Sequence, residues 1–262
     1  MNERPVALIT LASGYVGPPL ARLMARSGHD LVLHLPGSDG PTLVSDSDPD
    51  SDTTALLADL AAAGATVETV RDVDLRTAAG NQAVVDVAMK RFGRLDAACF
   101  VTGSIVTGKF LGATLEQWEK LKSVNLDMVF HALQAALVPM VAAGRGQIVV
   151  FTSATGARPE PMVSLYGATR AGANALVRAV GLEHAKYGVT VNAIGTNYMD
   201  FPGFRQATGA DDPERRAVIE GQVPMRRLGT MEELAEFTAV LLDGRSRFQT
   251  GQFFSYSGGW ST

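Results

Sequence analysis

The chain has 262 residues, of which 46% are hydrophobic and 19% are charged, and its formal net charge is −4 at pH 7. This length suits one α/β domain with a substantial buried core, so we treat residues 1–262 as a single domain. An acidic chain lacks the electrostatic footprint of a nucleic-acid-binding protein, which excludes nucleic acid as a partner.

The N-terminal segment does not resemble a targeting signal. The first residues, MNERPVALIT, contain the charged pair Glu3–Arg4 and only a short apolar run. No segment approaches the roughly eighteen apolar residues of a membrane span, so we expect no membrane association. The single cysteine, Cys99, lies in an apolar run and is expected to be a buried thiol, as is typical of a reducing compartment. We therefore predict a cytoplasmic protein.

Short apolar runs alternate with longer stretches of helical period along the chain. The runs predict seven strands, at Val6–Thr10, Leu31–Leu35, Thr66–Val70, Ala97–Val101, Ile148–Thr152, Val189–Ile194 and Gln252–Tyr256. The stretches between them predict helices at Val16–Ser27, Thr54–Ala63, Asn81–Arg91, Leu115–Ala142, Leu165–Tyr187 and Met231–Leu242. This alternation predicts an α/β fold: a Rossmann-like, doubly wound, seven-stranded parallel sheet with helices on both faces.

Two helix starts and two irregular segments complete the outline. Thr114–Gln117 and Thr230–Glu233 have the spelling of capping boxes, which fixes where the helices after them begin. Gly37–Asp52 is rich in Asp, Ser, Gly and Pro, and we expect a surface loop there. Thr196–Pro213 is irregular and follows the sixth strand, at the carboxyl edge where open α/β sheets bind ligands.

The strongest chemical signal is a serine just past the fifth predicted strand, Ser153, followed by Tyr166 and Arg170 on the next helix. Positions four residues apart share a helix face, so the guanidinium can lie beside the phenol. A fixed positive charge favours the phenolate, which makes Tyr166 a candidate general base, while Ser153 can hold the substrate oxygen. An isolated Tyr-x-x-x-Arg is usually a packed ring beside a surface charge, so the assignment depends on its context.

That context is FTSATG, then a loop, then LYGATRAGANALVRAVGLEHAKYGVTVNAI. The arrangement resembles the short-chain dehydrogenase/reductase family, whose catalytic serine and Tyr-x-x-x-Lys occupy these places, and the resemblance covers nearly the whole chain. Asp72 after the third strand, Asn125 in SVNLDMVF and the terminal TGQFFSYSGGW match as well. We expect a structural role for Asn125. The resemblance also implies a homotetramer, in which the small residues of the helix from Leu165 allow close packing.

The chain departs from that family where its members bind a nicotinamide dinucleotide. The motif Thr-Gly-x-x-x-Gly-x-Gly appears as TLASGYVG, in which Gly17 is in place but Leu11 and Tyr15 replace the other two glycines. These side chains are expected to fill the approach to the pyrophosphate. The second strand runs into LVLHLPG, without an acid for the adenosine ribose, and Arg170 replaces the family's lysine.

A further departure follows the sixth strand. Thr196 and Asn197 stand where the redox enzymes have Pro-Gly, and the turn continues with Tyr198 and Met199. With the broken glycine motif and the Tyr-x-x-x-Arg pair, this turn resembles an offshoot of the family, the halohydrin dehalogenases, and most closely their G-type branch. The resemblance implies a carbon–halide lyase that interconverts vicinal haloalcohols and epoxides without a cofactor. It also implies epoxide opening by azide, cyanide or nitrite.

The resemblance assigns the roles by position. Ser153, Tyr166 and Arg170 are the expected catalytic residues, and Tyr166 removes the hydroxyl proton before the alkoxide displaces the halide. The halide is expected to bind Tyr15 and backbone N–H groups of the turn Thr196–Met199. The four histidines lack metal-ligand spacing, so no metal is predicted.

Two alternatives stay open. One is an NAD(P)-dependent short-chain reductase with an atypical glycine motif, which nucleotide binding would identify. The other is a catalytically silent binding protein of the same fold, against which the intact catalytic trio argues. The substrate, a small molecule, depends on how Met162, Phe201, Phe204 and Trp260, from this chain or a neighbour, fold over the cleft.

Overall fold

The described residues of this computed structural model, 4–36 and 53–261, form one seven-stranded sheet. The strand order is β3-β2-β1-β4-β5-β6-β7, and all neighbouring strands are parallel. The bounds are β1 Val6–Ile9, β2 Asp30–His34, β3 Val67–Val70, β4 Ala97–Phe100, β5 Gly146–Ser153, β6 Val189–Thr196 and β7 Phe253–Tyr256. The predicted fold class is confirmed. The surface loop predicted at 37–52 lies outside the described residues.

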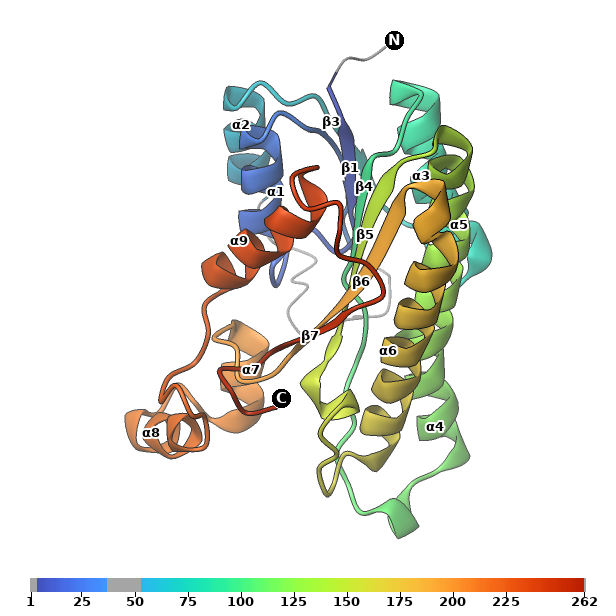
Figure 1. Cartoon of the computed structure of the whole chain (residues 1–262). Coiled ribbons are helices and arrows are strands. Elements are labelled where there is room, and N and C mark those ends of the chain that lie inside the picture. Colours follow the sequence, from blue (N-terminus) through green and yellow to red (C-terminus); the bar gives the residue numbers. More distant parts are fainter. Residues whose placement is uncertain (1–3, 37–52, 262) are drawn as a thin grey trace.

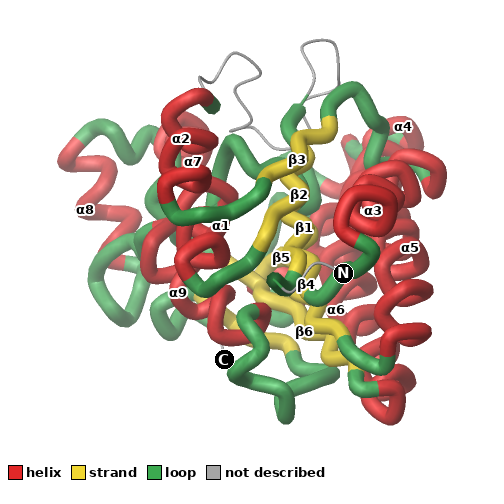
Figure 2. The backbone as a smooth tube through the Cα atoms, turned by 90° about the horizontal axis from the view of Figure 1, so that it is seen from above, coloured by secondary structure: helices red, strands yellow, loops and turns green. Residues whose placement is uncertain are grey.

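Helices cover both faces of this sheet. Figure 1 shows α1, α2 and α9 on one face and α3, α5 and α6 on the other, and Figure 2 shows the same division from above. The bounds are α1 Gly17–Arg26, α2 Thr54–Ala62, α3 Ala78–Phe92, α4 Leu115–Lys122, α5 Met128–Ala143, α6 Ser164–His184, α7 Pro202–Thr208, α8 Pro213–Gly221 and α9 Met231–Leu242. The strand order reverses between β1 and β4, which places the expected ligand crevice at the carboxyl ends of these strands.

The central strands are buried along almost their whole length. Every residue of β1, β2, β4 and β5 is buried, and β6 is partly exposed only at its last residue. Because helices shield both faces, these strands are nearly continuous apolar runs, which is why the sequence revealed them. Cys99, in β4, is fully buried as expected, and burial raises the pKa of its thiol.

Both predicted capping boxes are present. The Thr114 side chain accepts from the Gln117 N–H and the Thr230 side chain from the Glu233 N–H, each at 3.1 Å. The helix predicted as continuous over 115–142 is interrupted: a π-helical turn, Ser123–Asp127, separates α4 from α5. Such turns insert one extra residue and redirect the side chains next to them.

The run Leu115–Ala143 bears on the expectation that no segment could span a membrane. By length and composition this run is apolar enough to do so, and 44% of its most apolar window is buried inside the protein. Within the described residues it is the single run that meets this criterion. Its α5 part packs against α3, β4 and β5, so its apolar character belongs to a helix that covers the sheet.

The segment Thr196–Pro213, predicted as irregular, contains helix α7, and a further helix that was not predicted, α8, begins at its end. α7 and α8 begin at Pro202 and Pro213, whose fixed φ suits the first turn of a helix. Asp200 accepts from Arg205 at 2.8 Å and from Arg216 at 2.6 Å, which ties the end of the turn after β6 to both helices. The helices are short and bury few residues, so their hydrophobic period is too weak to be detected.

Candidate active site

Ser153 is fixed at the carboxyl end of β5. Its side chain is 3% exposed, and its Oγ accepts a hydrogen bond from the Thr155 N–H at 3.1 Å. The Ser153 hydroxyl also lies 3.5 Å from the carbonyl oxygen of Thr196, the paired residue on β6, to which it can donate. The serine is therefore held at the carboxyl edge of the sheet, between the turn after β5 and the end of β6.

Tyr166 and Arg170 lie together on α6, as their spacing predicted. The Arg170 Cζ is 5.3 Å from the centroid of the Tyr166 ring, so the guanidinium stacks over the ring. The 3-10 turn that follows β5, at residues 154–156, approaches this helix closely, because a Cβ added at Gly156 would lie 2.8 Å from the Arg170 carbonyl carbon. The structure thus brings the three predicted catalytic residues to one edge of the sheet.

The sequence reasoning missed the partner of Arg170. The guanidinium is 4% exposed and donates from Nη1 to the Thr102 Oγ1 at 3.0 Å and from Nη2 to the Thr102 carbonyl oxygen at 2.5 Å. Thr102 follows β4 immediately after Val101, and its position after a buried strand was the one available signal. The arginine therefore bridges α6 and the carboxyl end of β4.

Asn125 has the bracing role that we expected. It lies in the π-helical turn, and its side chain exchanges hydrogen bonds with the backbone N–H and carbonyl of Ser104, both at 3.0 Å. Its Nδ2 also donates to the Thr169 Oγ1 at 3.1 Å. The π turn thereby fixes the segment after β4 against α6.

Tyr15 extends across the cleft toward β6. Its hydroxyl is 2.8 Å from the Thr196 Oγ1, and its ring makes edge contacts with Phe151 at 5.8 Å and Phe201 at 5.0 Å between centroids. Phe201 in turn lies 6.1 Å from Phe204. Tyr15 therefore packs on Phe151 and Phe201 and joins the loop after β1 to the end of β6.

The turn after β6, in which the halide site is predicted, uses two of its N–H groups within the protein. The Tyr198 N–H donates to the Asn197 Oδ1 at 2.9 Å, and the Asn197 N–H to the Tyr256 carbonyl at 3.4 Å. Met199 is 2% exposed and pairs with Gly229 as an isolated bridge. The halide site at this turn stays a prediction.

Tyr198 is not a competing base. Its hydroxyl donates to the Gln222 Oε1 at 2.8 Å, and burial raises its pKa, so it stays protonated at neutral pH. Its ring packs against Trp260 at 5.7 Å. Trp260 also stacks under Arg158 of the same chain, with the Arg158 Cζ 4.5 Å from the ring centroid. Within the single chain, Trp260 therefore packs against the turn after β6.

The loop after β1 keeps the backbone path of a glycine motif but fills it with side chains. Leu11 and Tyr15 have φ angles of 52° and 50°, in the left-handed region that glycine adopts most easily. Leu11 is 3% exposed and belongs to the core. At Gly17 glycine is required, because a Cβ there would lie 2.5 Å from the Ala12 carbonyl oxygen.

The start of α1 also lacks donors for a pyrophosphate. A helix N-terminus binds phosphate through free backbone N–H groups. Here Pro18 and Pro19 have no N–H, the Gly17 N–H donates to the Gly14 carbonyl at 2.9 Å, and the Leu20 N–H donates to Val16 at 3.0 Å. The residues of this loop therefore do not fit a dinucleotide in the usual manner of the family.

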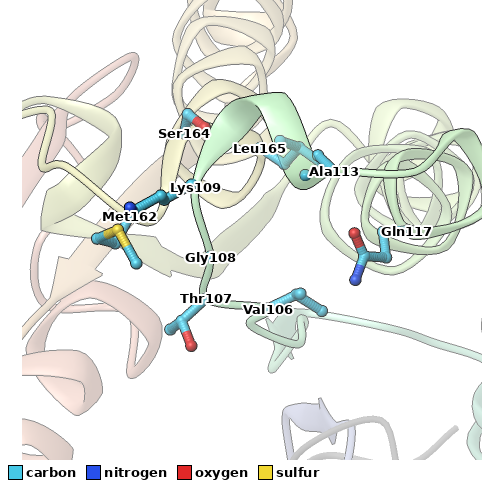
Figure 3. A pocket seen from close by; sticks show the side chains of 10 residues that line it. Val106, Thr107, Gly108, Lys109, Ala113, Gln117, Met162, Ser164 and Leu165 are labelled. Carbon is cyan, nitrogen blue, oxygen red and sulfur yellow. The ribbon is translucent and has the colours of Figure 1, made fainter.

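A cavity of about 200 Å³ opens beside the start of α6 (Figure 3). Its walls include Thr107 and Lys109 from the segment after β4, together with Met162 and Leu165. The Gly108 N–H donates to the Met162 carbonyl at 2.7 Å, which joins the two walls. Met162, which we expected over the cleft, lines this cavity next to the helix that carries Tyr166.

A family model described as enoyl-(acyl carrier protein) reductase matches residues 16–261. The chain belongs to this family, within the short-chain dehydrogenases/reductases. It is 28% identical over 256 residues to "uncharacterized oxidoreductase YohF" of Escherichia coli (strain K12), covering 97% of this chain and 95% of the relative. It is 28% identical over 267 residues to D-beta-hydroxybutyrate dehydrogenase of Rhizobium meliloti (strain 1021), covering 97% and 98%. The solved structure of levodione reductase superposes with a TM-score of 0.83 at 27% identity, covering 97% and 96%.

These relatives correct the predicted function. Their names are those of oxidoreductases, and they contradict the prediction of a halohydrin dehalogenase, a carbon–halide lyase. The prediction gave most weight to the few positions that depart from the family, whereas similarity to named dehydrogenases and reductases extends over the whole chain. The reductase alternative is the one that the comparisons favour.

His34, the last residue of β2, is hydrogen-bonded to the loop after β1, and its protonation makes the stability of the fold depend on pH. Its Nδ1 accepts from the Leu11 N–H at 3.3 Å, and burial lowers its pKa to about 4. Between about pH 6.5 and pH 4, His34 is protonated in the unfolded chain but neutral in the folded chain. The free energy of unfolding therefore falls as the pH is lowered through this range. The shift corresponds to roughly 3 kcal/mol of unfolding free energy.

We expect wild type to lose about this much more stability than His34→Gln between neutral pH and pH 4, measured by urea denaturation. His29, whose pKa burial also lowers, is present in both proteins and its contribution cancels. Equal losses in the two proteins would show that His34 is not held neutral.

Proposed function

We propose that this chain is an oxidoreductase of the short-chain dehydrogenase/reductase type that acts on an alcohol or the corresponding carbonyl compound. The observation that carries the proposal is the buried Arg170 guanidinium stacked over Tyr166, with Ser153 at the same sheet edge. This arrangement suits proton transfer at a substrate oxygen. The names of the relatives, which are dehydrogenases and reductases, support the redox class.

The chain's own residues account for the proton step. The Ser153 hydroxyl orients the substrate oxygen, and Tyr166 gives or takes the proton at that oxygen. The positive charge of Arg170 lies 5.3 Å from the centre of the Tyr166 ring, where it stabilises negative charge on the phenol. Proton transfer of this kind contributes roughly 10²–10⁴-fold to a rate.

The same residues do not account for the hydride step. In the family a nicotinamide supplies or accepts the hydride when it is bound. The loop after β1 does not fit that group in the usual manner, because Tyr15 crosses the cleft and Pro18 and Pro19 remove donors from the start of α1. We expect NADH and NADPH to bind weakly.

The cavity of about 200 Å³ beside the start of α6 is lined by Leu165, the residue before Tyr166, and we propose that the part of the substrate beyond the reacting oxygen occupies it. The wall combines Thr107, Lys109 and the apolar Met162 and Leu165. A small, partly apolar ketone or secondary alcohol matches this lining.

Tyr166→Phe tests the proposed role of the phenol. Wild type should interconvert members of a panel of small ketones and secondary alcohols when NADH or NADPH is supplied in large excess. Tyr166→Phe should lose at least about 100-fold of this rate because it removes the proton-transfer group. Chromatography of products measures turnover, and circular dichroism checks that the variant is folded.

Two results would contradict the proposal. One is wild-type turnover that Tyr166→Phe retains. The other is the absence of any carbonyl reduction or alcohol oxidation by the wild-type protein across the panel.

Tyr15→Gly tests the obstruction of the nucleotide site. The glycine relieves the positive φ at this position and clears the space beside Thr196. We expect NADH to bind at least about tenfold more tightly, a gain of about 1.4 kcal/mol, by titration calorimetry. Tyr15→Phe, which keeps the ring and loses the hydroxyl, is the matched control and should bind as wild type does. Wild-type binding as tight as that of Tyr15→Gly would show that the ring is no obstacle.

A homotetramer is part of the proposal. α5 and α6 enclose a groove with apolar walls that include Leu133, Leu137 and Leu176, and Phe130 and Val138 at its rim are 48% and 70% exposed. Burial of such a surface against a second copy is favourable. Light scattering should give four times the mass of the 27.7 kDa chain, and Val138→Glu should reduce it. A monomeric wild-type protein would exclude this assembly.

The proposed location is the cytoplasm. The one cysteine, Cys99, is a fully buried thiol, and a protein of this kind has no need of an oxidising compartment. The proposed partners are a small-molecule substrate and other copies of this chain.

A further inference from the structure

Arg170 carries a buried charge that no carboxylate neutralises within the described part of the chain. Buried guanidinium groups are ordinarily paired with an acid, because an isolated buried charge is costly. Here the partners are a hydroxyl and a carbonyl, both from Thr102. The Arg170 Nε has no hydrogen-bond partner among the described residues. The positive charge is therefore available to a negative charge that forms nearby.

Thr102 contacts the guanidinium at two points. The Nη1 donates to the side-chain Oγ1 and the Nη2 to the carbonyl oxygen of the same residue. The Thr102 hydroxyl itself donates to the Phe151 carbonyl on β5 at 3.0 Å, so its lone pairs face the arginine. Two bonds from one planar group to one residue fix both the position and the tilt of the guanidinium.

The absence of a side chain at Gly103 provides the space that the Arg170 guanidinium occupies. Its φ is +114°, and a Cβ there would lie 1.6 Å from the Arg170 Nη2 and 2.6 Å from the Asn125 Oδ1. The backbone cannot easily move away, because Asn125 holds the next residue, Ser104, through both its N–H and its carbonyl. A side chain at position 103 therefore has to displace Arg170.

We propose that Thr102 and Gly103 are positioning residues that hold the Arg170 guanidinium over the ring of Tyr166. They act through the arginine and not on the substrate. The proposal rests on the role given to Tyr166 and Arg170 under the proposed function. It adds the two residues after β4, Thr102 and Gly103, to those that shape the active site.

The test compares four variants. Thr102→Val keeps the shape of the side chain and removes the hydroxyl that accepts from Nη1. Thr102→Ser restores a hydroxyl and should rescue the effect. Gly103→Ala displaces the guanidinium, and Thr102→Val decides the question if Gly103→Ala does not fold. Thr190→Val is the matched control. Thr190 is also buried, but it lies at the amino end of β6, away from Arg170, and its hydroxyl has no hydrogen-bond partner among the described residues.

The readout is the position of the Arg170 guanidinium over the Tyr166 ring, followed by the ring-current shift of the Arg170 Nε–H signal in nitrogen-15-edited NMR spectra. Loss of the signal in Arg170→Lys assigns it, and Tyr166→Leu gives its position in the absence of a ring. The measurement needs no substrate, so its failure is distinguishable from a failure of the proposed function.

In Thr102→Val and Gly103→Ala, we expect the Arg170 Nε–H signal to move to the position that it has in Tyr166→Leu, because the guanidinium no longer lies over a ring. Thr102→Ser and Thr190→Val should keep the wild-type position. Folded Thr102→Val and Gly103→Ala proteins with an unchanged signal would overturn the proposal. An equal displacement in Thr190→Val would overturn it as well, because the position of Arg170 would then not depend on Thr102.

Discussion

The charge of Arg170 lies inside the protein, and three parts of the chain meet around it for that reason. α6 supplies the arginine and the ring of Tyr166 that its guanidinium covers. The carboxyl end of β4 supplies the acceptors of Thr102, and the π-helical turn at 123–127 anchors the adjoining backbone through Asn125. Because a buried charge without such partners is strongly unfavourable, these contacts also fix how closely α6 approaches the sheet. Stability and chemistry at this edge therefore depend on the same hydrogen bonds.

The loop after β1 illustrates a compromise between backbone and side chain. A left-handed φ costs a non-glycine residue about 1–2 kcal/mol, and Tyr15 accepts that conformation. Its ring then gains two aromatic edge contacts, worth about 0.5–1.5 kcal/mol each, and its hydroxyl gains a bond to Thr196. The gain offsets the strain. The path of a glycine-rich loop is thus retained, while the space that glycine would leave open is used for packing inside the chain.

The sequence was sufficient for the features that local chemistry determines. Both capping boxes follow from one threonine and one acceptor three residues later, and Tyr166 and Arg170 meet because they are one helical turn apart. The seat of Arg170 could not be found in this way, because Thr102 lies 68 residues before it and no period links the two. α7 and α8 were missed because few of their residues are buried. The function was misassigned because a handful of replaced motif residues outweighed similarity that is spread thinly over the whole chain.

The C-terminal segment has a practical consequence for handling the protein. Trp260 and Ser261 are both buried, and the Trp260 carbonyl accepts from Arg158 while its ring lies under the same guanidinium. Because all strands are parallel, the described chain enters the sheet at its amino edge, before β1, and leaves it at its carboxyl edge, after β7 (Figure 1). An affinity tag fused to the C-terminus would follow closely on Trp260, whose ring packs against Tyr198 in the turn after β6. Purification tags and immobilisation linkers therefore belong at the N-terminus, where they leave the mouth of the cleft undisturbed.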